Sequence, residues 1–294
     1  MSLKMTRRTL LASAAGVSAA AFINASVLKA EDSTPAEFTK PEGFRGNLKQ
    51  SVSQWCFAST PIAELMAQCK KIGMVGLDLI QPGDWPTLRE AGMVVTMGSM
   101  PEITIPVGPN HAENHEKIIA AYEKYIPMAK ELGVPNLIAL AGNREGQDDA
   151  TGAKNTIACM KQVMPLAEKY GINIVMELLN TKDHLDYQCD STVWGVEVCD
   201  GVGSDRFKLL YDIYHMQRME GDIIQTIRKY HQYIGHYHTA GNPGRNDLDD
   251  SQELYYPPII DAIMDTGYTG FLAHEFLPKK GFESLYNAVC LCDR

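Results

Sequence analysis

Short apolar runs and longer amphipathic stretches alternate along most of the chain. The apolar runs are rich in Val, Ile, Leu and Met, and each is followed by a stretch with helical spacing of its apolar side chains. This alternation predicts repeated strand-helix units around a parallel sheet. The predicted strands begin near Val52, Met74, Val94, Asn136, Ile172, Phe207, Ile234 and Gly270, and the clearest helical patterns span Ile62–Lys71, His115–Leu132, Asn155–Tyr170 and Pro258–Thr266.

The number of units indicates the fold. Eight strand-helix repeats within residues 48–294 fit a closed (β/α)8 TIM barrel that forms a single domain. An open, doubly wound sheet is the alternative, but it usually carries a glycine-rich phosphate loop after its first strand. The segment from Ser51 to Cys56 has no glycine, and Gly201-Val202-Gly203 precedes a strand instead. We therefore predict an α/β protein with a TIM barrel.

The first thirty residues have a different pattern. Arg7 and Arg8 precede an apolar, uncharged run over residues 10–27, which is typical of a removable export signal. The paired arginines and following leucines match a twin-arginine signal, which exports proteins already folded. We predict a signal peptide over residues 1–30, a polar arm over residues 31–47 and a periplasmic or otherwise exported protein. A membrane anchor is the alternative, but the run is short for a span of about twenty residues, so no stable membrane insertion is expected after cleavage.

The charge of the chain narrows the class of ligand. Its 294 residues carry 27 Lys and Arg against 36 Asp and Glu, a formal net charge of −9. Cleavage after Ala30 would remove four positive charges and no negative ones, leaving −13. An acidic protein repels a phosphate backbone, so we expect a small-molecule substrate and no nucleic acid. The sequence leaves open whether the protein forms a homo-oligomer.

Polar residues end four consecutive predicted strands in the second half of the chain. Their separations of 35, 26 and 37 residues each correspond to about one strand-helix unit. Side chains at the carboxyl ends of barrel strands converge above the barrel. Three carboxylates and an imidazole placed together repel one another unless a cation lies among them. Oxygen ligands with one imidazole suit Mn²⁺, Mg²⁺ or Co²⁺ better than a structural zinc site. The four residues are Glu177, Asp212, His238 and Glu275.

Three segments carry a resemblance to a known family. Residues 211–221, Tyr-Asp-Ile-Tyr-His-Met-Gln-Arg-Met-Glu-Gly, resemble the Asp-x-Tyr-His-x-Gln-x-x-Glu-Gly segment of hydroxypyruvate isomerases. Residues 235–245, which end in Asn-Pro-Gly-Arg, and residues 252–256, Gln-Glu-Leu-Tyr-Tyr, are similar to two further segments of that family. The resemblance runs in order from about Gln50 to Glu283. It implies a xylose isomerase-like barrel, the superfamily that also includes the ketose 3-epimerases.

The resemblance also implies roles for individual residues. The family's metal ligands fall on the four residues already found at strand ends, and two of these, Glu177 and Glu275, would be the catalytic carboxylates. Substrate-contacting roles would fall on His215 and Arg245. Hydroxypyruvate isomerases usually have Gln where this chain has His238, whereas ketose 3-epimerases have His.

The expected reaction is a metal-dependent isomerisation of a small hydroxy-keto acid or sugar through an enediolate. A divalent cation, Mn²⁺ or Mg²⁺ before Co²⁺ or Zn²⁺, would stabilise the enediolate, and the two carboxylates would move the proton. Arg245 favours an acid substrate because a guanidinium pairs well with a carboxylate, whereas His238 favours a sugar. The alternatives are a ketose 3-epimerase or sugar dehydratase, an endonuclease of the same superfamily, which the charge opposes, and a noncatalytic exported sugar-binding barrel.

Overall fold

The computed structural model describes residues 37–294. The predicted signal, residues 1–30, and the first part of the predicted arm lie outside the described residues. Eight parallel strands form one sheet in the order β3-β2-β1-β8-β7-β6-β5-β4, which confirms the predicted class of α/β TIM barrel. The strands are β1 (Lys49–Ser53), β2 (Gly76–Asp78), β3 (Val94–Val95), β4 (Asn136–Ala139), β5 (Asn173–Glu177), β6 (Phe207–Asp212), β7 (Ile234–Thr239) and β8 (Phe271–His274).

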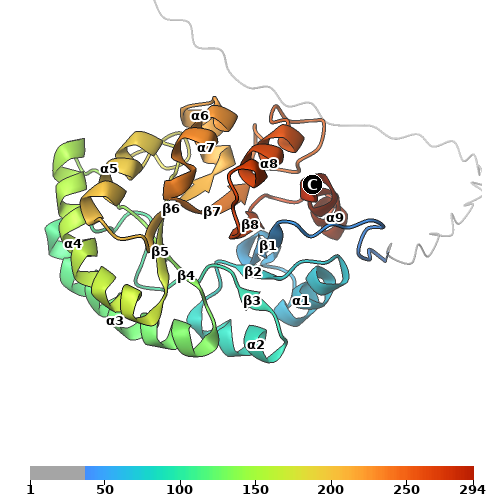
Figure 1. The fold of residues 1–294 in the computed structure, drawn as a ribbon, viewed down its shortest axis with the longest axis horizontal. Helices are drawn as coiled ribbons and strands as arrows, with labels where there is room; N and C mark the ends of the chain where they lie inside the picture. The colour runs from blue at the N-terminus through green and yellow to red at the C-terminus, as the bar shows by residue number, and fades with distance from the viewer. Residues whose placement is uncertain (1–36) are drawn as a thin grey trace, which may run out of the picture. The chain divides into compact units, whose positions relative to one another are not determined.

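Helices surround the strands, as Figure 1 shows. Two predicted helices have the predicted bounds, but α4 begins six residues earlier than Asn155 because the side chain of Asp148 accepts a hydrogen bond from the Thr151 N–H and caps the helix. The α-helices are α1 (Ile62–Lys71), α2 (Trp85–Glu90), α3 (His115–Leu132), α4 (Asp149–Tyr170), α5 (Thr192–Val202), α6 (Ile213–Met219), α7 (Ile223–Tyr230), α8 (Tyr256–Asp265) and α9 (Phe282–Cys292).

A single glycine joins the two edge strands of the sheet. Gly98 lies just beyond β3, and its N–H donates to the Asn136 carbonyl at 2.8 Å while its carbonyl accepts from the Ile138 N–H at 3.0 Å. A Cβ atom at this position would lie 2.6 Å from Cζ2 of Trp85 and 2.8 Å from Cδ2 of Leu137. Only glycine therefore permits this close approach, through which the β3 and β4 edges meet.

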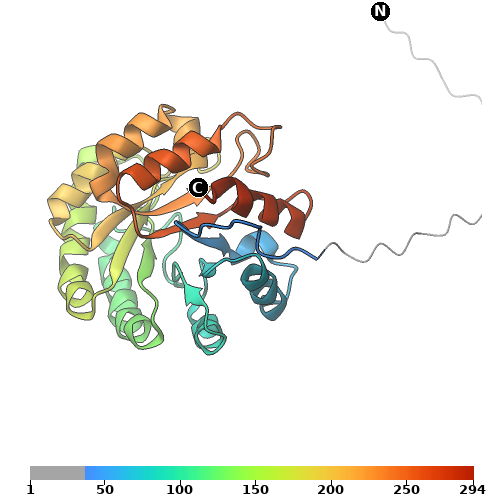
Figure 2. The same cartoon turned by 45° about the vertical axis from the view of Figure 1, so that its right-hand side comes forward.

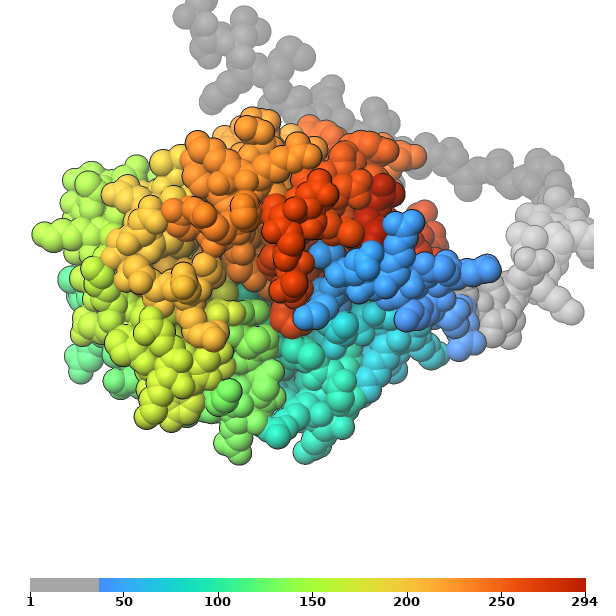
Figure 3. All heavy atoms as spheres, in the orientation of Figure 1, coloured from blue at the N-terminus to red at the C-terminus, as the bar shows by residue number. Residues whose placement is uncertain are grey.

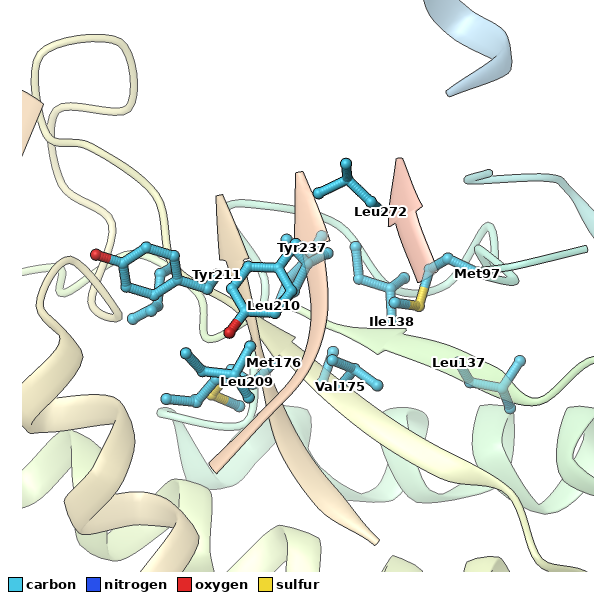
Figure 4. Packing of buried hydrophobic residues seen from close by; sticks show 14 of the residues in the cluster. Met97, Leu137, Ile138, Val175, Met176, Leu209, Leu210, Tyr211, Tyr237 and Leu272 are labelled. Atoms are coloured by element: carbon cyan, nitrogen blue, oxygen red, sulfur yellow. The ribbon is translucent and has the colours of Figure 1, made fainter. Parts of the chain in front are cut away.

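The two faces of the strands have different chemistry. Met176, Tyr211 and Tyr237 lie together on neighbouring strands in Figure 4, and the two tyrosine rings are 6.2 Å apart. Since successive side chains along a strand point to opposite faces, the residues that follow them in sequence point to the other face. Those residues are Glu177, Asp212 and His238. The alternation of side chains between the two faces of each strand therefore brings these polar groups to the barrel interior.

The described part of the predicted arm packs against the last helix. The ring of Phe38 lies 5.1 Å from that of Tyr286 in α9. The Arg45 and Gly46 N–H groups donate to the two carboxylate oxygens of Asp293 at 2.6 and 2.7 Å. Figure 3 shows the blue segment beside the red one, and Figure 2 shows the same neighbourhood after a turn about the vertical axis. None of the helices within residues 37–294 is long and apolar enough to cross a membrane.

Candidate metal centre and active site

The four residues predicted from strand ends lie together at one end of the barrel. Their ligand atoms all lie within 4.8 Å of one another, and all four side chains are buried. Glu177 and Asp212 end β5 and β6, His238 lies in β7, and Glu275 directly follows β8. Nδ1 of His238 lies 2.7 Å from Oε2 of Glu275, 3.7 Å from Oε1 of Glu177 and 4.0 Å from Oδ2 of Asp212. These distances suit a set of groups that could share one cation.

Local hydrogen bonds hold the carboxylates in place. Oδ1 of Asp212 accepts from the N–H groups of Tyr214 and His215 at 2.8 and 3.1 Å and so caps α6, which leaves Oδ2 for the cluster. Oε1 of Glu275 accepts from Nε1 of Trp55 at 2.6 Å. Asp212 and Glu275 therefore each have one carboxylate oxygen fixed by the protein scaffold and one directed at the cluster.

The buried carboxylates favour a positive partner. Burial raises the pKa of Glu177 and raises the pKa of Asp212 to about 7, because a buried carboxylate is costly to ionise. Burial acts in the same direction on Glu275, but the charges of Arg245 and His238 outweigh it and hold the pKa of Glu275 well below its usual range. Carboxylate oxygens with one imidazole nitrogen are ligands that Mn²⁺, Mg²⁺ and Zn²⁺ accept. The donor set fits a divalent cation.

A fifth residue, Asp78, supports the cluster and was missed by the sequence analysis. It is fully buried at the end of β2, and its Oδ1 lies 2.9 Å from Nε2 of His238. Its Oδ2 lies 3.1 Å from Nε2 of His236 and accepts from Oγ1 of Thr96 at 2.5 Å. A carboxylate that accepts from one ring nitrogen of a histidine directs the other nitrogen to the metal. Its position at the end of β2 obeys the same strand-end rule as the four clustered residues.

Replacing Asp78 with Asn should weaken metal binding about 10- to 100-fold, because the partner that orients His238 loses its charge. Titration calorimetry with Mn²⁺ measures the Kd. The matched control is Asp205→Asn, an exposed residue before β6. A Kd that is equal in both variants would remove Asp78 from the metal centre.

The two predicted substrate contacts occupy different environments. His215 is fully buried, its Nδ1 accepts from the Asn180 N–H at 3.1 Å, and its Nε2 lies 3.6 Å from Oδ2 of Asp212. Burial lowers the pKa of His215 well below its usual value, so the ring is neutral. The ring is not among the side chains that line the cavity described below, and its contact with a substrate stays a prediction.

Arg245 lies directly against the cluster. Its Nη2 donates to Oδ2 of Asp212 at 3.2 Å and to Oε2 of Glu275 at 2.5 Å. The guanidinium carbon lies 5.4 Å from the ring centre of Trp55 and 5.5 Å from that of Tyr214, so two aromatic faces enclose the charge. The guanidinium thus pairs with two members of the cluster and also lines the cavity described below, so its contact with a substrate stays a prediction.

A cavity of about 380 Å³ opens beside the cluster. Glu177, Glu275, Arg245 and Trp55 line it, together with His184, which the sequence analysis did not single out. The ring of His184 lies 5.6 Å from that of His215. Burial and the nearby Arg245 lower the pKa of His184, so this imidazole is neutral near pH 7. Both carboxylates with predicted catalytic roles therefore reach space in which a substrate could bind.

The other polar residues of the resembling segments hold loops together. Nε2 of Gln217 donates to Oε1 of Glu253 at 3.2 Å. The carboxylate of Glu220 accepts from the N–H and hydroxyl of Thr192 at 2.6 and 2.7 Å, at the start of α5. Gln252 accepts from the Leu254 N–H at 2.7 Å within its own turn. These contacts tie the segments that follow β5, β6 and β7 to one another.

The fold and the cluster together define a TIM-barrel protein with a candidate metal centre at the carboxyl ends of its strands. Comparison with known families agrees with this class. Residues 57–286 match the family described as xylose isomerase-like TIM barrel, and the chain belongs to that family. It is 27% identical to the hydroxypyruvate isomerase of Escherichia coli, over 82% of this chain and 95% of that protein. It is 26% identical to the 2-oxo-tetronate isomerase of Cupriavidus necator, over 74% of this chain and 78% of that protein. The chain is accordingly an isomerase of this barrel family.

Solved structures show the same fold. The AP endonuclease, family 2, from Brucella melitensis superposes with a TM-score of 0.72 at 20% identity, over 81% of this chain and 96% of that one. The IOLI protein, solved with a bound zinc atom, superposes with a TM-score of 0.65 at 15% identity, over 83% of this chain and 95% of that one. At these identities the likeness concerns the fold alone.

Proposed function

We propose that the protein is a divalent-metal-dependent isomerase that moves a proton between carbons of a small hydroxy-carbonyl compound. The observation that carries the proposal is the cluster of Glu177, Asp212, His238 and Glu275, which opens onto a cavity through its two glutamates. The curated relatives, named hydroxypyruvate isomerase and 2-oxo-tetronate isomerase, support the same reaction class. Mn²⁺ or Mg²⁺ is the proposed cation, with Co²⁺ and Zn²⁺ as alternatives.

The protein groups have separate tasks in this proposal. A bound divalent cation would stabilise the negative charge of an enediolate as a Lewis acid. Glu177 and Glu275 both reach the cavity, so one takes a proton from the carbon next to the carbonyl and the other returns it. Trp55 holds Oε1 of Glu275, while Oε2 of Glu275 faces His238 and Arg245. Asp212 and His238 complete the ligand set, and His215, whose Nε2 lies 3.6 Å from Oδ2 of Asp212, is the proposed donor to a substrate oxygen.

Proton exchange in D₂O tests the proposal. The purified protein, loaded with Mn²⁺ or Mg²⁺, is incubated with hydroxypyruvate, a 2-oxo-tetronate and a panel of ketoses and aldoses, and NMR follows deuterium incorporation. Metal-dependent exchange into at least one compound is expected. If a metal-loaded protein exchanges none of them, the noncatalytic sugar-binding barrel or a dehydratase takes the place of the isomerase.

A ketose 3-epimerase is the second candidate. The observation in its favour is His238, since ketose 3-epimerases have His where hydroxypyruvate isomerases usually have Gln. The two reactions differ in the product. Return of the proton to the other face of the same carbon gives an epimer, whereas return to the neighbouring carbon gives an aldose or aldehyde, and NMR of the product separates them.

We also propose that the chain is exported through the twin-arginine pathway, on the sequence of residues 1–30. Replacing both Arg7 and Arg8 with Lys should keep the protein in the cytoplasm, because the paired guanidinium groups are the recognised feature of the signal. Cell fractionation and immunoblotting measure the location. The matched control, Lys4→Arg, should be exported normally, and export of the double variant at the normal level would contradict the proposal.

A further inference from the structure

The cavity has an apolar wall away from the four clustered residues. Those four residues lie in or directly after β5 to β8, whereas this wall comes from the residue after β2, from β4 and the residues after it, and from the segment between β3 and α3. Such side chains offer neither hydrogen bonds nor charge to a ligand, and they favour contact with C–H surface. The side chains are Leu79, Met100, Ile103, Ile105, Ile138 and Leu140.

Two polar side chains near this wall, Gln81 and Ser99, are joined by a hydrogen bond. Nε2 of Gln81 donates to the hydroxyl of Ser99 at 3.0 Å, and that hydroxyl donates to the Leu79 carbonyl at 3.1 Å. Gln54 and Trp55, which follow β1, line the cavity between the wall and Glu275. Hydroxyl groups of a ligand are therefore best satisfied close to the cluster, and the far part of the ligand meets hydrocarbon.

The charges around the cavity are balanced without an anionic ligand. Of the described residues that line it, Arg245 alone carries a permanent positive charge, and this charge already pairs with Asp212 and Glu275. The carboxylate of Asp78 is paired with His236 and His238, and the carboxylates of Glu177, Asp212 and Glu275 would be neutralised by this guanidinium and one divalent cation. A substrate carboxylate or phosphate would need a further cation, and His184 is neutral. Burying an unpaired charge costs several kcal/mol, on the order of the binding energy of a small ligand.

We propose that the substrate is an uncharged hydroxy-ketone of the sugar type, whose part remote from the reacting carbons is apolar. The inference rests on the proposed function and specifies its substrate class. The apolar part could be the methyl group of a deoxy sugar or the aglycone of a glycoside, since both present C–H surface to the wall. The class differs from the acids in the names of the two curated relatives.

Matched probes test the substrate class. The D₂O exchange assay compares D-fructose, its 6-deoxy analogue, a keto-hexopyranoside with a methyl or phenyl aglycone, D-fructose 6-phosphate and hydroxypyruvate. An added apolar group that fits a hydrophobic pocket is worth about 10- to 200-fold in kcat/KM, so we expect the deoxy sugar or the glycoside to exceed fructose by at least about 10-fold. Whichever of these two probes exchanges faster than fructose shows whether the apolar part is the methyl group of a deoxy sugar or the aglycone of a glycoside. Faster exchange of the phosphate or of hydroxypyruvate would overturn the inference.

A binding measurement separates this inference from the proposed function. Thermal unfolding of the metal-loaded protein is recorded with each probe at equal concentration. Without exchange of any probe the isomerase proposal fails, but the inference still holds if the apolar-substituted ketones raise the Tm more than the acid and the phosphate do. An equal or larger shift with the charged probes would overturn it.

Variants of the wall provide a second test. Ile105 is half-buried in the wall, and Ile105→Asn should reduce the preference for the apolar-substituted probe over fructose about 10-fold, the effect of one misplaced apolar contact. The matched control is Val193→Asn, 63% exposed on α5 and outside the cavity, which should keep the preference. Ile103→Thr is the second wall variant, used if Ile105→Asn does not fold. An unchanged preference in the folded wall variant would contradict the inference.

Discussion

Replacing Glu177 or Glu275 with Gln is expected to reduce deuterium incorporation into the substrate by about 10²- to 10⁴-fold, the usual contribution of a general acid or base. The amide oxygen of Gln remains available as a ligand, but it cannot take up a proton near neutral pH. The loss should therefore appear in kcat and kcat/KM together. NMR in D₂O measures the exchange, and elemental analysis measures the metal held by each variant.

The matched control for both variants is Glu197→Gln, an exposed position on α5. It carries the same change in charge and shape away from the cavity, and its exchange rate should equal that of the unmodified protein. Full activity in either Glu177→Gln or Glu275→Gln would contradict the two-carboxylate mechanism. A loss of bound metal in one variant would assign that glutamate mainly to the metal.

Adding Mn²⁺ to the metal-free protein is expected to raise its free energy of unfolding by about 2.7 kcal/mol when the free ion is at 100 times its Kd. The physical reason is the buried cluster, because the pKa of Asp212 rises to about 7 when burial acts on its carboxylate among other acids. A cation that binds only the folded protein removes this cost. Thermal and denaturant unfolding after treatment with a chelator, with and without added Mn²⁺ or Mg²⁺, measure the shift.

Asp212→Asn should abolish most of this stabilisation by metal. Asn can still cap α6 through its side-chain oxygen, so the fold of the loop is kept while one ligand charge is lost. Asp205→Asn, which lies outside the cluster, should retain the full shift. An equal metal-dependent shift in Asp212→Asn would contradict the assignment of Asp212 as a ligand.

The sequence predicted which segments form helices better than it predicted the residue at which each helix begins. The helices Ile62–Lys71 and His115–Leu132 were predicted with their observed bounds, because their apolar periodicity starts and stops with the helix. The predicted helix at Pro258 begins instead at Tyr256, since proline is readily accepted in the first turn, where its missing N–H costs nothing. Patterns of apolar spacing thus locate an element, whereas caps and first turns set where it begins.

The four clustered residues were predicted from strand ends alone, because parallel barrel strands all end at one face. Asp78 was missed although it obeys the same rule. Its role depends on contact with His238, 160 residues further along the chain, and on a strand of only three residues. The pairing of Arg245 with Asp212 and Glu275 was also beyond the sequence, since a loop residue can turn toward either the ligand or the protein.

The contacts between β1 and β8, and between the arm and α9, have a consequence for biosynthesis. Val52 pairs with His274, and Gly46 bonds to Asp293, 247 residues further on. The first strand of the sheet therefore lacks one neighbour until β8 and α9 have left the ribosome. Contacts of such long sequence separation form slowly, so until β8 has emerged a nascent chain keeps an open sheet edge at β1 that chaperones can recognise.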